Sequence, residues 1–340
     1  MSKCTMFVGL DYHDSGVQMC VLDDRGRVLS NRMCANDWRS LQVAVSEFGP
    51  DANIHAGIEA CNGAVDLALE LRDRAGWSID QAHPGYVARL KQSPDKTDFG
   101  DARLLADLVR VGYLPKVWIA PEYISELRSV VRYRQQLVRQ QTAIKLQIGA
   151  MLRKQRLRFA GRRWTKAWIA WARDGAELPP QHRWVIGRQF ARLDELRREI
   201  RDTEKRLQQV TADDPVVARL LTLDAVGLVT AVTLRAEIGR FDRFRTGKQL
   251  ARFCGVSPRN ASSGRRQADA GLIKAGNSEL RCVLIETAHR LRNFTDRWTD
   301  FAVQMKRRGK PACVIAAAIA NRWVRKLFHE MKDLGPGLAG

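Results

Sequence analysis

The sequence predicts an α/β domain at the N-terminus followed by a predominantly helical chain. Over residues 1–118, short strand-like runs of alternating apolar and polar residues are interspersed with amphipathic helical patterns. From Pro121 onward, helical spacing of the apolar residues dominates. The charge divides at the same place, because residues 1–118 hold 13 Lys or Arg against 16 Asp or Glu, and the remainder holds 44 against 21. We therefore expect at least two parts of different architecture.

The N-terminal part reads as strands followed by alternating helices and strands. Three apolar runs indicate a meander, and a cap residue before helical spacing indicates each helix. Pro84 is expected to end a strand and to be followed by a loop. In order, we predict strands at 5–12, 16–22 and 28–34, a helix at 36–49, a strand at 53–61, a helix at 64–76, a strand at 77–84 and a helix at 96–109. This is the order of a ribonuclease H-like domain, a mixed sheet flanked by helices.

Residues 121–210 show almost purely helical patterns, interrupted at Pro179-Pro180. They predict two long antiparallel helices, a coiled-coil arm that is a natural dimerisation element. Between these helices, Trp164, Trp168 and Trp171 stand among five basic residues. Helical spacing puts the three rings on one face, where they either stack on nucleic-acid bases or form a packing stripe.

A third unit is expected from residue 213. The stretch LLTLDAVGLVTAVTLRAEIG has the outline of a helix-hairpin-helix, in which backbone amides receive a DNA phosphate, although Ala225 stands where a glycine is expected. A Gly- and Ser-rich loop, an apolar helix and two helices joined by RRGKP follow. The predicted domains are therefore an α/β domain at 1–120, a basic helical arm at 121–212, a mostly helical domain at 213–333 and a tail at 334–340.

Composition argues against several classes of protein. The seven cysteines form no C-x-x-C pair, which disfavours a zinc site or a disulfide framework. The longest apolar run near the C-terminus, residues 312–320, is about half the length that a membrane span needs. The N-terminus lacks a signal pattern. We expect a cytoplasmic protein without a membrane partner, associated with the bacterial nucleoid when it binds DNA.

The basic excess points to a polyanionic partner. Residues 127–173 contain 13 Lys or Arg and no Asp or Glu, so internal ion pairs cannot neutralise them. Phosphate backbones are the favoured partner, and a merely solvated basic helix is the alternative. The residues predicted to contact nucleic acid here are Arg153, Lys154, Arg156, Arg158, Arg162 and Arg163.

Four acidic residues of the N-terminal domain are candidates for one site. Asp11 lies in the first strand, Glu59 ends the strand IHAGIE, and Asp98 and Asp101 open the last helix one turn apart. Each could be structural, as a helix cap or a strand-end polar group. In a mixed sheet of this order, however, the four can converge, and they would then repel one another unless hard divalent cations neutralise them. Two magnesium ions about 4 Å apart would suit a phosphodiester displacement.

Six ordered motifs resemble one known family. GLDYH, GIEACNG, KTDFGDARLLADLV, LDAVGLVTAV, GKQLARFCGVSPRNASSG and IKAGNSELR are similar in order and spacing to the DEDD transposases of the insertion-sequence 110 family, from about residue 7 to 331. The resemblance implies a RuvC-like domain followed by a transposase domain, and for some members guidance by a bridge RNA. It places the family's acidic tetrad on Asp11, Glu59, Asp98 and Asp101.

The resemblance also implies a serine nucleophile in the loop after the G-V-S-P turn. Ser262 and Ser263 stand there, and Ser263, directly before a glycine, matches the family. Arg265, Arg266 and Lys274 are expected to hold phosphate near it. Composition alone would make this segment a flexible surface loop.

The expected function is therefore that of an insertion-sequence recombinase that cuts and rejoins DNA through a covalent serine-DNA intermediate. Mg²⁺, with Mn²⁺ as a substitute, is the expected cofactor. Donor and target DNA, a structured guide RNA and further copies of the chain, as a homodimer or homotetramer, are the expected partners. Two alternatives stay open at this point: a RuvC-like metal-dependent nuclease or junction resolvase that uses water, and a non-catalytic nucleic-acid-binding scaffold.

Overall fold

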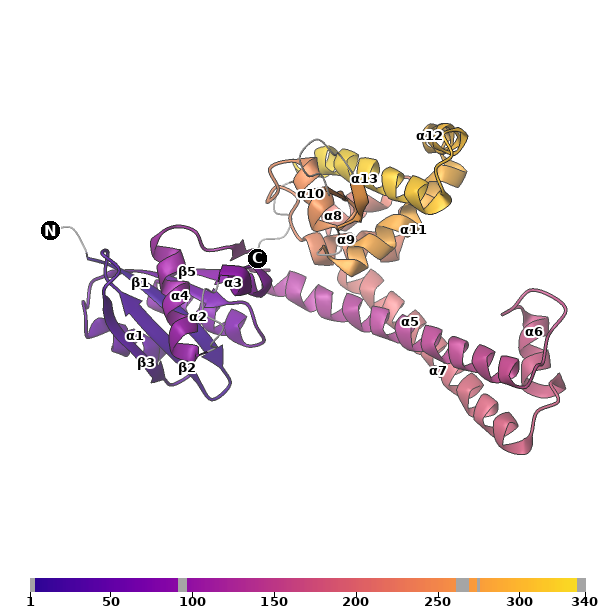
Figure 1. Cartoon of the computed structure of the whole chain (residues 1–340), viewed down its shortest axis with the longest axis horizontal. Coiled ribbons are helices and arrows are strands. Elements are labelled where there is room, and N and C mark those ends of the chain that lie inside the picture. The colour runs from indigo at the N-terminus through magenta and orange to yellow at the C-terminus, as the bar shows by residue number, and fades with distance from the viewer. Residues whose placement is uncertain (1–3, 91–96, 261–268, 274–275, 335–340) are drawn as a thin grey trace. The chain divides into compact units, whose positions relative to one another are not determined.

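The computed structural model describes residues 4–90, 97–260, 269–273 and 276–334, and the chain forms two compact units, Met1–Ile119 and Ala120–Gly340 (Figure 1). Ser262, Ser263, Arg265, Arg266 and Lys274 lie outside the described residues. The predicted architecture is confirmed, because the first unit is an α/β domain with a mixed sheet and the second is mostly helical. The further division of the second unit near residue 212 stays a prediction.

The first unit is built on a six-stranded sheet of order β3-β2-β1-β4-β5-β6. β1 pairs antiparallel with β2 and parallel with β4, so the predicted meander and the mixed sheet are both present. β4 and β5 are also parallel. The strands are β1 (Thr5–His13), β2 (Gly16–Leu22), β3 (Val28–Cys34), β4 (Asn53–Glu59), β5 (Ser78–Ala82) and β6 (Lys116–Val117).

Helices cover both faces of this sheet. α1 (Trp38–Ser46) and α2 (Ala64–Ala75) share a core with Met6, Val8 and Leu10 of β1, whereas α4 (Asp98–Arg110) packs with Cys20 and Leu22 of β2 on the other face. Successive side chains of a strand point to opposite faces. The odd-numbered residues of β1 therefore face α4. Gly9 marks the closest approach, since a Cβ at that position would lie 1.9 Å from the carbonyl oxygen of Ala102.

One predicted boundary is wrong. The segment after the strand at 78–82 is not a loop, because α3 (Pro84–Leu90) begins at Pro84. Proline is favoured in the first turn of a helix, where its missing N–H has no partner to lose. The same residue that stops a strand therefore starts a helix here.

Two long helices form the first part of the second unit. α5 (Glu122–Lys154) and α7 (Pro180–Val210) lie side by side and are joined through α6 (Lys166–Ala170) and the π-helical turn η1 (Trp171–Gly175), as predicted for an antiparallel arm (Figure 1). The base of α5 contributes Leu127 and Val131 to the core of the C-terminal helices. Its far end contributes Ile148 and Leu152 to a separate core with Trp168 and Phe190. We call the segment 149–175 the arm tip.

The remaining helices pack around the base of α5. They are α8 (Pro215–Leu221), α9 (Leu228–Ile238), α10 (Gly247–Phe253), α11 (Ser278–Phe294), α12 (Asp296–Arg307) and α13 (Ala312–Met331), and the short strands β7 (Pro258–Asn260) and β8 (Asp269–Leu272) pair antiparallel. α8 and α9 form the predicted helix-hairpin-helix. Ala225, in its turn, has φ 63°, the left-handed conformation that glycine adopts without strain.

A buried ion pair within the hairpin also accepts a hydrogen bond from α5. Arg235 donates from Nε to Asp214 Oδ2 at 2.7 Å, and the two side chains are 4% and 0% exposed. Tyr123 also donates to this carboxylate at 3.0 Å, and Asp214 Oδ1 caps α8 by accepting from the Val216 and Val217 amides. Among the helices described, none is long and apolar enough to cross a bilayer.

Candidate active site

The site is built where the end of β1 meets the start of α4. Asp11 lies two residues beyond Gly9 on β1, so the alternation of the strand directs it to the face that α4 covers. Thr97 accepts from the Gly100 amide at 3.1 Å and thereby fixes where α4 begins. Asp98 and Asp101 consequently fall in the first turn of the helix.

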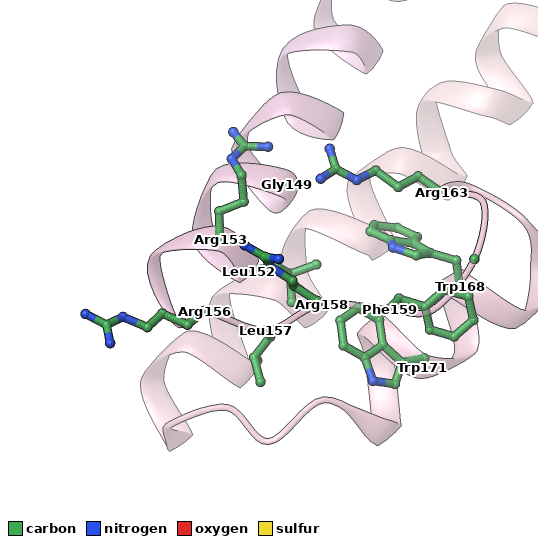
Figure 2. A pocket seen from close by; sticks show the side chains of 11 residues that line it. Gly149, Leu152, Arg153, Arg156, Leu157, Arg158, Phe159, Arg163, Trp168 and Trp171 are labelled. Carbon is green, nitrogen blue, oxygen red and sulfur yellow. The ribbon is translucent and has the colours of Figure 1, made fainter.

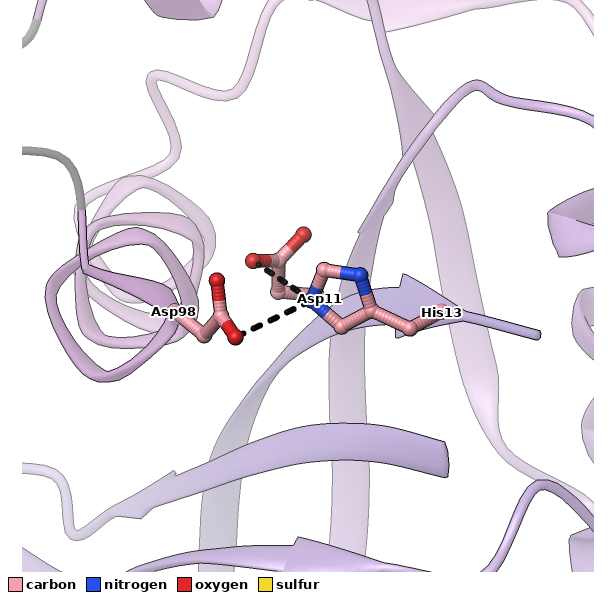
Figure 3. Close-up of side chains that lie close together, drawn as sticks. All are labelled: Asp11, His13 and Asp98. Atoms are coloured by element: carbon pink, nitrogen blue, oxygen red, sulfur yellow. Dashed lines mark ion pairs between the residues drawn. The ribbon is translucent and has the colours of Figure 1, made fainter. Parts of the chain in front are cut away.

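His13 completes a compact group with two of the predicted acids. Its Nε2 lies 3.5 Å from Asp11 Oδ2 and 3.3 Å from Asp98 Oδ2, and one ligand atom from each of the three residues lies within 4.8 Å of the others (Figure 3). Figure 3 shows the imidazole pointing from the strand toward both carboxylates. The sequence analysis missed His13, although its place two residues after Asp11 on one strand put it on the same face.

Glu59 and Asp101 lie outside this triad but within its electrostatic reach. β4 runs parallel to β1 with Gly9 opposite Gly57 and Leu10 opposite Ile58, so Glu59 follows on the face of Gly57, which contacts α4 through Val109. Negative charge on Asp101, Asp98 and Glu59 raises the pKa of Asp11. The structure thus brings the other three predicted acids within electrostatic reach of Asp11, and Asp98 joins it in the triad.

Burial adds to the cost of charge at Asp11. Its side chain is 16% exposed, and desolvation is the main cause that raises its pKa, whereas the nearby His13 lowers it. Asp11 Oδ2 and His13 Nε2 are both shielded from solvent and make no hydrogen bond with the described residues. A buried carboxylate oxygen without a hydrogen-bond donor is costly unless a cation neutralises it.

The donor set fits a divalent metal ion. Carboxylate oxygens are the ligands that Mg²⁺ and Mn²⁺ prefer, and the buried Asp11 oxygen is available for coordination. Asp98 is 46% exposed and can supply a second oxygen on the open side. Asp11 and Asp98, with His13, would hold such an ion, while Glu59 and Asp101 add negative charge around it.

The predicted serine loop spans the gap between two short strands. Pro258 of β7 pairs with Leu272 of β8, and the connecting residues 261–268 carry Ser262, Ser263, Arg265 and Arg266 outside the described structure. The base of this hairpin is fixed, because the Ile273 amide donates to Ser257 O at 3.0 Å.

The predicted nucleic-acid contacts of the arm lie at its tip. Arg153, Arg156, Arg158 and Arg163 line a pocket together with aromatic rings, and Lys154 and Arg162 are exposed beside it. The three tryptophans do not share one helix face, because Trp164 precedes α6 and has φ 65°. They nevertheless pack together, with ring centroids 4.5 Å apart for Trp164 and Trp168 and 6.4 Å apart for Trp168 and Trp171.

Comparison with known proteins places both parts of the chain in one family. The family model of DEDD transposases of the insertion-sequence 110 family, described as "Transposase", matches residues 8–155, and the model described as "Transposase IS116/IS110/IS902 family" matches residues 217–302. The first match contains the acidic site and the second contains the serine loop.

Curated relatives agree with these matches. A "Probable family 20 transposase" of Pseudomonas aeruginosa is 29% identical over 80% of this chain and 82% of the relative. The "Transposase for insertion sequence element IS1111A" of Coxiella burnetii is 27% identical over 94% of this chain and 88% of the relative. With its motifs, both domain matches and relatives along nearly its whole length in agreement, the chain belongs to the insertion-sequence 110 family of transposases.

Proposed function

We propose that this transposase cuts and rejoins DNA through a covalent bond to Ser263, assisted by Mg²⁺ or Mn²⁺ on the acidic cluster of Asp11, Glu59, Asp98 and Asp101. The observation that carries the acidic part is the buried Asp11 oxygen, which accepts no hydrogen bond from the described residues and lies within reach of Asp98 and His13. The serine rests on the family resemblance of the GVSPRNASSG motif. Arg265, Arg266 and Lys274 would steady the attacked phosphate.

The proposed reaction exchanges one phosphodiester bond for another. The Ser263 hydroxyl oxygen attacks the phosphorus and loses its proton, the bond from phosphorus to one deoxyribose oxygen breaks, and that oxygen leaves as a hydroxyl after gaining a proton. The reverse attack by a new deoxyribose hydroxyl rejoins DNA and frees the serine. Because the number of ester bonds is unchanged, no ATP is needed.

The acidic residues have a separate task. A divalent ion, when bound, neutralises the charge that develops on the phosphate oxygens. Asp11 and Asp98 would fix the position of that ion. His13 Nε2, at 3.3–3.5 Å from both carboxylates, would offer a third ligand atom at the same position.

The serine mechanism is tested with Ser263→Ala, and Ser262→Ala is its matched control. DNA carrying the flanks of this element, with RNA transcribed from them, is incubated with the full chain and Mg²⁺. We expect the denaturation-resistant protein-DNA adduct to disappear in Ser263→Ala and to persist in Ser262→Ala. Strand cleavage that continues in Ser263→Ala without an adduct would instead support a nuclease that uses water.

The acidic site is tested by direct metal binding as well as by cleavage. Asp98→Asn and Asp11→Asn should weaken Mn²⁺ binding, followed by calorimetry, and abolish metal-dependent cleavage while leaving DNA affinity unchanged within about twofold. Full cleavage by both variants would overturn the metal site and would favour a non-catalytic scaffold.

We further propose that a structured guide RNA selects the DNA and that the arm tip contacts its phosphates, in a dimer or tetramer. The support is the segment 127–173, which has 13 basic residues and no acidic one. Replacing Arg153, Lys154, Arg156 and Arg158 by alanine should lower the slope of log affinity against log salt by about 3, because each single-strand phosphate contact contributes about 0.7. An unchanged slope would show that this segment does not grip the phosphates.

A further inference from the structure

The arm tip encloses a pocket that is separate from both the acidic cluster and the serine loop. Its volume is about 760 Å³, within the range of about 300–1,000 Å³ that is usual for small-molecule sites. It lies between the end of α5, the segment that follows it, and the α6–η1 turn. Figure 2 shows the rings of Phe159, Trp168 and Trp171 together on one side and the side chains of Arg153 and Arg156 on the other.

The aromatic wall is preorganised. Trp168 is 3% exposed and is held in the arm-tip core by Phe190, with ring centroids 6.5 Å apart. Phe159 and Trp171 are half-buried, lie 5.3 Å apart with an interplanar angle of 42°, and line the pocket. A planar ligand can therefore stack on rings that are already fixed, at little cost in side-chain entropy.

The charge around the pocket is not balanced within the described chain. Nearer the base of α5, Arg132, Arg134 and Arg139 pair with Glu237, Glu204 and Glu279. Arg153, Arg156, Arg158 and Arg163 form no ion pair with any residue that the structure describes, and all four are exposed. The pocket residues include no acid. Its chemistry suits a ligand that is both planar and anionic.

Arg156 occupies its place against backbone preference. It has φ 56°, and the Arg156 and Leu157 amides donate to Arg153 O and Leu152 O, which is the hydrogen-bond pattern of a helix end that glycine normally closes. An arginine in this conformation is strained, and such strain concentrates at functional positions. The position therefore supplies a charge at a place where the fold alone would favour glycine.

We propose that the arm-tip pocket binds one unpaired nucleotide of a single-stranded or bulged nucleic acid. The base stacks on Phe159 beside the tilted ring of Trp171, and the flanking phosphates contact the arginines at the rim. A base within a duplex is stacked on both sides and cannot enter a pocket, so the site distinguishes an extruded nucleotide from paired ones. This inference rests on the proposed binding of nucleic acid by the arm. It adds that the arm tip recognises an unpaired nucleotide in that nucleic acid.

The test compares hairpins that differ by one bulged nucleotide. Binding of the full chain to labelled RNA hairpins with and without the bulge is measured by fluorescence anisotropy, and the DNA versions are measured in parallel. We expect about tenfold tighter binding of the bulged hairpin, in line with the stacking of one base. A preference with RNA, with DNA or with both supports the pocket and identifies its source of nucleotides.

Two variants separate the pocket from general charge. Phe159→Leu keeps the apolar volume and should remove the preference for the bulge while leaving affinity for the paired hairpin unchanged. Arg156→Gly removes a pocket charge and relieves the backbone, so it should weaken binding of the bulged hairpin more than Lys154→Ala, which removes a neighbouring charge outside the pocket.

Equal affinity of the unaltered chain for both hairpins would overturn the pocket proposal and leave the phosphate grip intact. If the chain bound neither hairpin at any salt concentration tested, both the pocket and the phosphate grip would be ruled out. Displacement of the bulged hairpin by an equimolar acidic peptide, with no effect from a single-stranded oligonucleotide, would assign the pocket to a protein ligand and would also overturn the proposal.

Discussion

The closest backbone contact in the first unit offers the sharpest test of how the fold builds the site. A Cβ at Gly9 would lie 1.9 Å from Ala102 O and 2.5 Å from the Ala106 amide nitrogen, both in the backbone of α4. Ordinary contact begins near 3.4 Å, so Gly9→Ala requires α4 to move by about 1.5 Å. Since a helix backbone cannot rotate out of the way as a side chain can, we expect a loss of about 3 kcal/mol, the upper end of typical overpacking costs.

The matched control is Gly57→Ala. Gly57 pairs with Gly9 across β1 and β4, but its added Cβ would meet a side-chain atom, Val109 Cγ2, at 2.6 Å, and a side chain can shift without displacing the backbone of α4. We expect this variant to cost about 1 kcal/mol. The same substitution at two paired positions thus separates displacement of the helix from a general effect of alanine in the sheet.

Amide hydrogen exchange of β1 and α4 in the full chain measures the local stability of this unit, and calorimetry with Mn²⁺ measures the site. Asp98 begins α4, so the displacement should separate it from Asp11 and weaken Mn²⁺ binding in Gly9→Ala more than in Gly57→Ala. Equal exchange protection in the two variants would refute the reasoning that Gly9 sets the distance between helix and strand.

Three further outcomes are expected. Ala225→Gly should raise the free energy of unfolding by about 1 kcal/mol in urea titration, because glycine adopts φ 63° without strain; a loss of stability would contradict this account of the turn. Arg235→Met should lower it by about 3–5 kcal/mol, because Asp214 stays buried without its cation, and an unchanged urea midpoint would show that the pair is dispensable. The pKa of Asp11 is raised above 3.8 in the folded chain, so its contribution to stability is full below that pH and falls as the pH rises through the folded pKa. Asp11→Asn should therefore flatten the dependence of Tm on pH above 4, measured in EDTA. Parallel curves for the variant and the unaltered chain would contradict the pKa shift.

The sequence predicted the parts of the site that depend on periodicity and capping. Asp11 was expected in the first strand, and Asp98 and Asp101 were expected to open the last helix, and the structure has them there. The sequence analysis did not identify His13 as a site residue, because a single histidine on a strand forms no recognisable motif. Only its distances to two carboxylates place it in the site. Local rules place a side chain on a face, whereas the approach of α4 to β1 depends on packing at Gly9.

The errors in the predicted fold come from residues whose local pattern fits more than one structure. Pro84 ends a strand and also opens α3. Trp164 has helical spacing from Trp168 but a left-handed backbone, which is visible only in coordinates. The two-residue strand β6 is too short for any periodicity to show.

The length of α5 has an electrical consequence. Its 33 residues span about 50 Å, several times the Debye length of about 8 Å at physiological salt. Charge changes at the arm tip are therefore screened from the Arg132–Glu237 ion pair and from the Arg235–Asp214 pair that Tyr123 contacts, both toward the base of the helix. The changes in binding free energy caused by substitutions at the two ends of the arm should therefore add. Affinity can then be altered at one end without changing the contribution of the other.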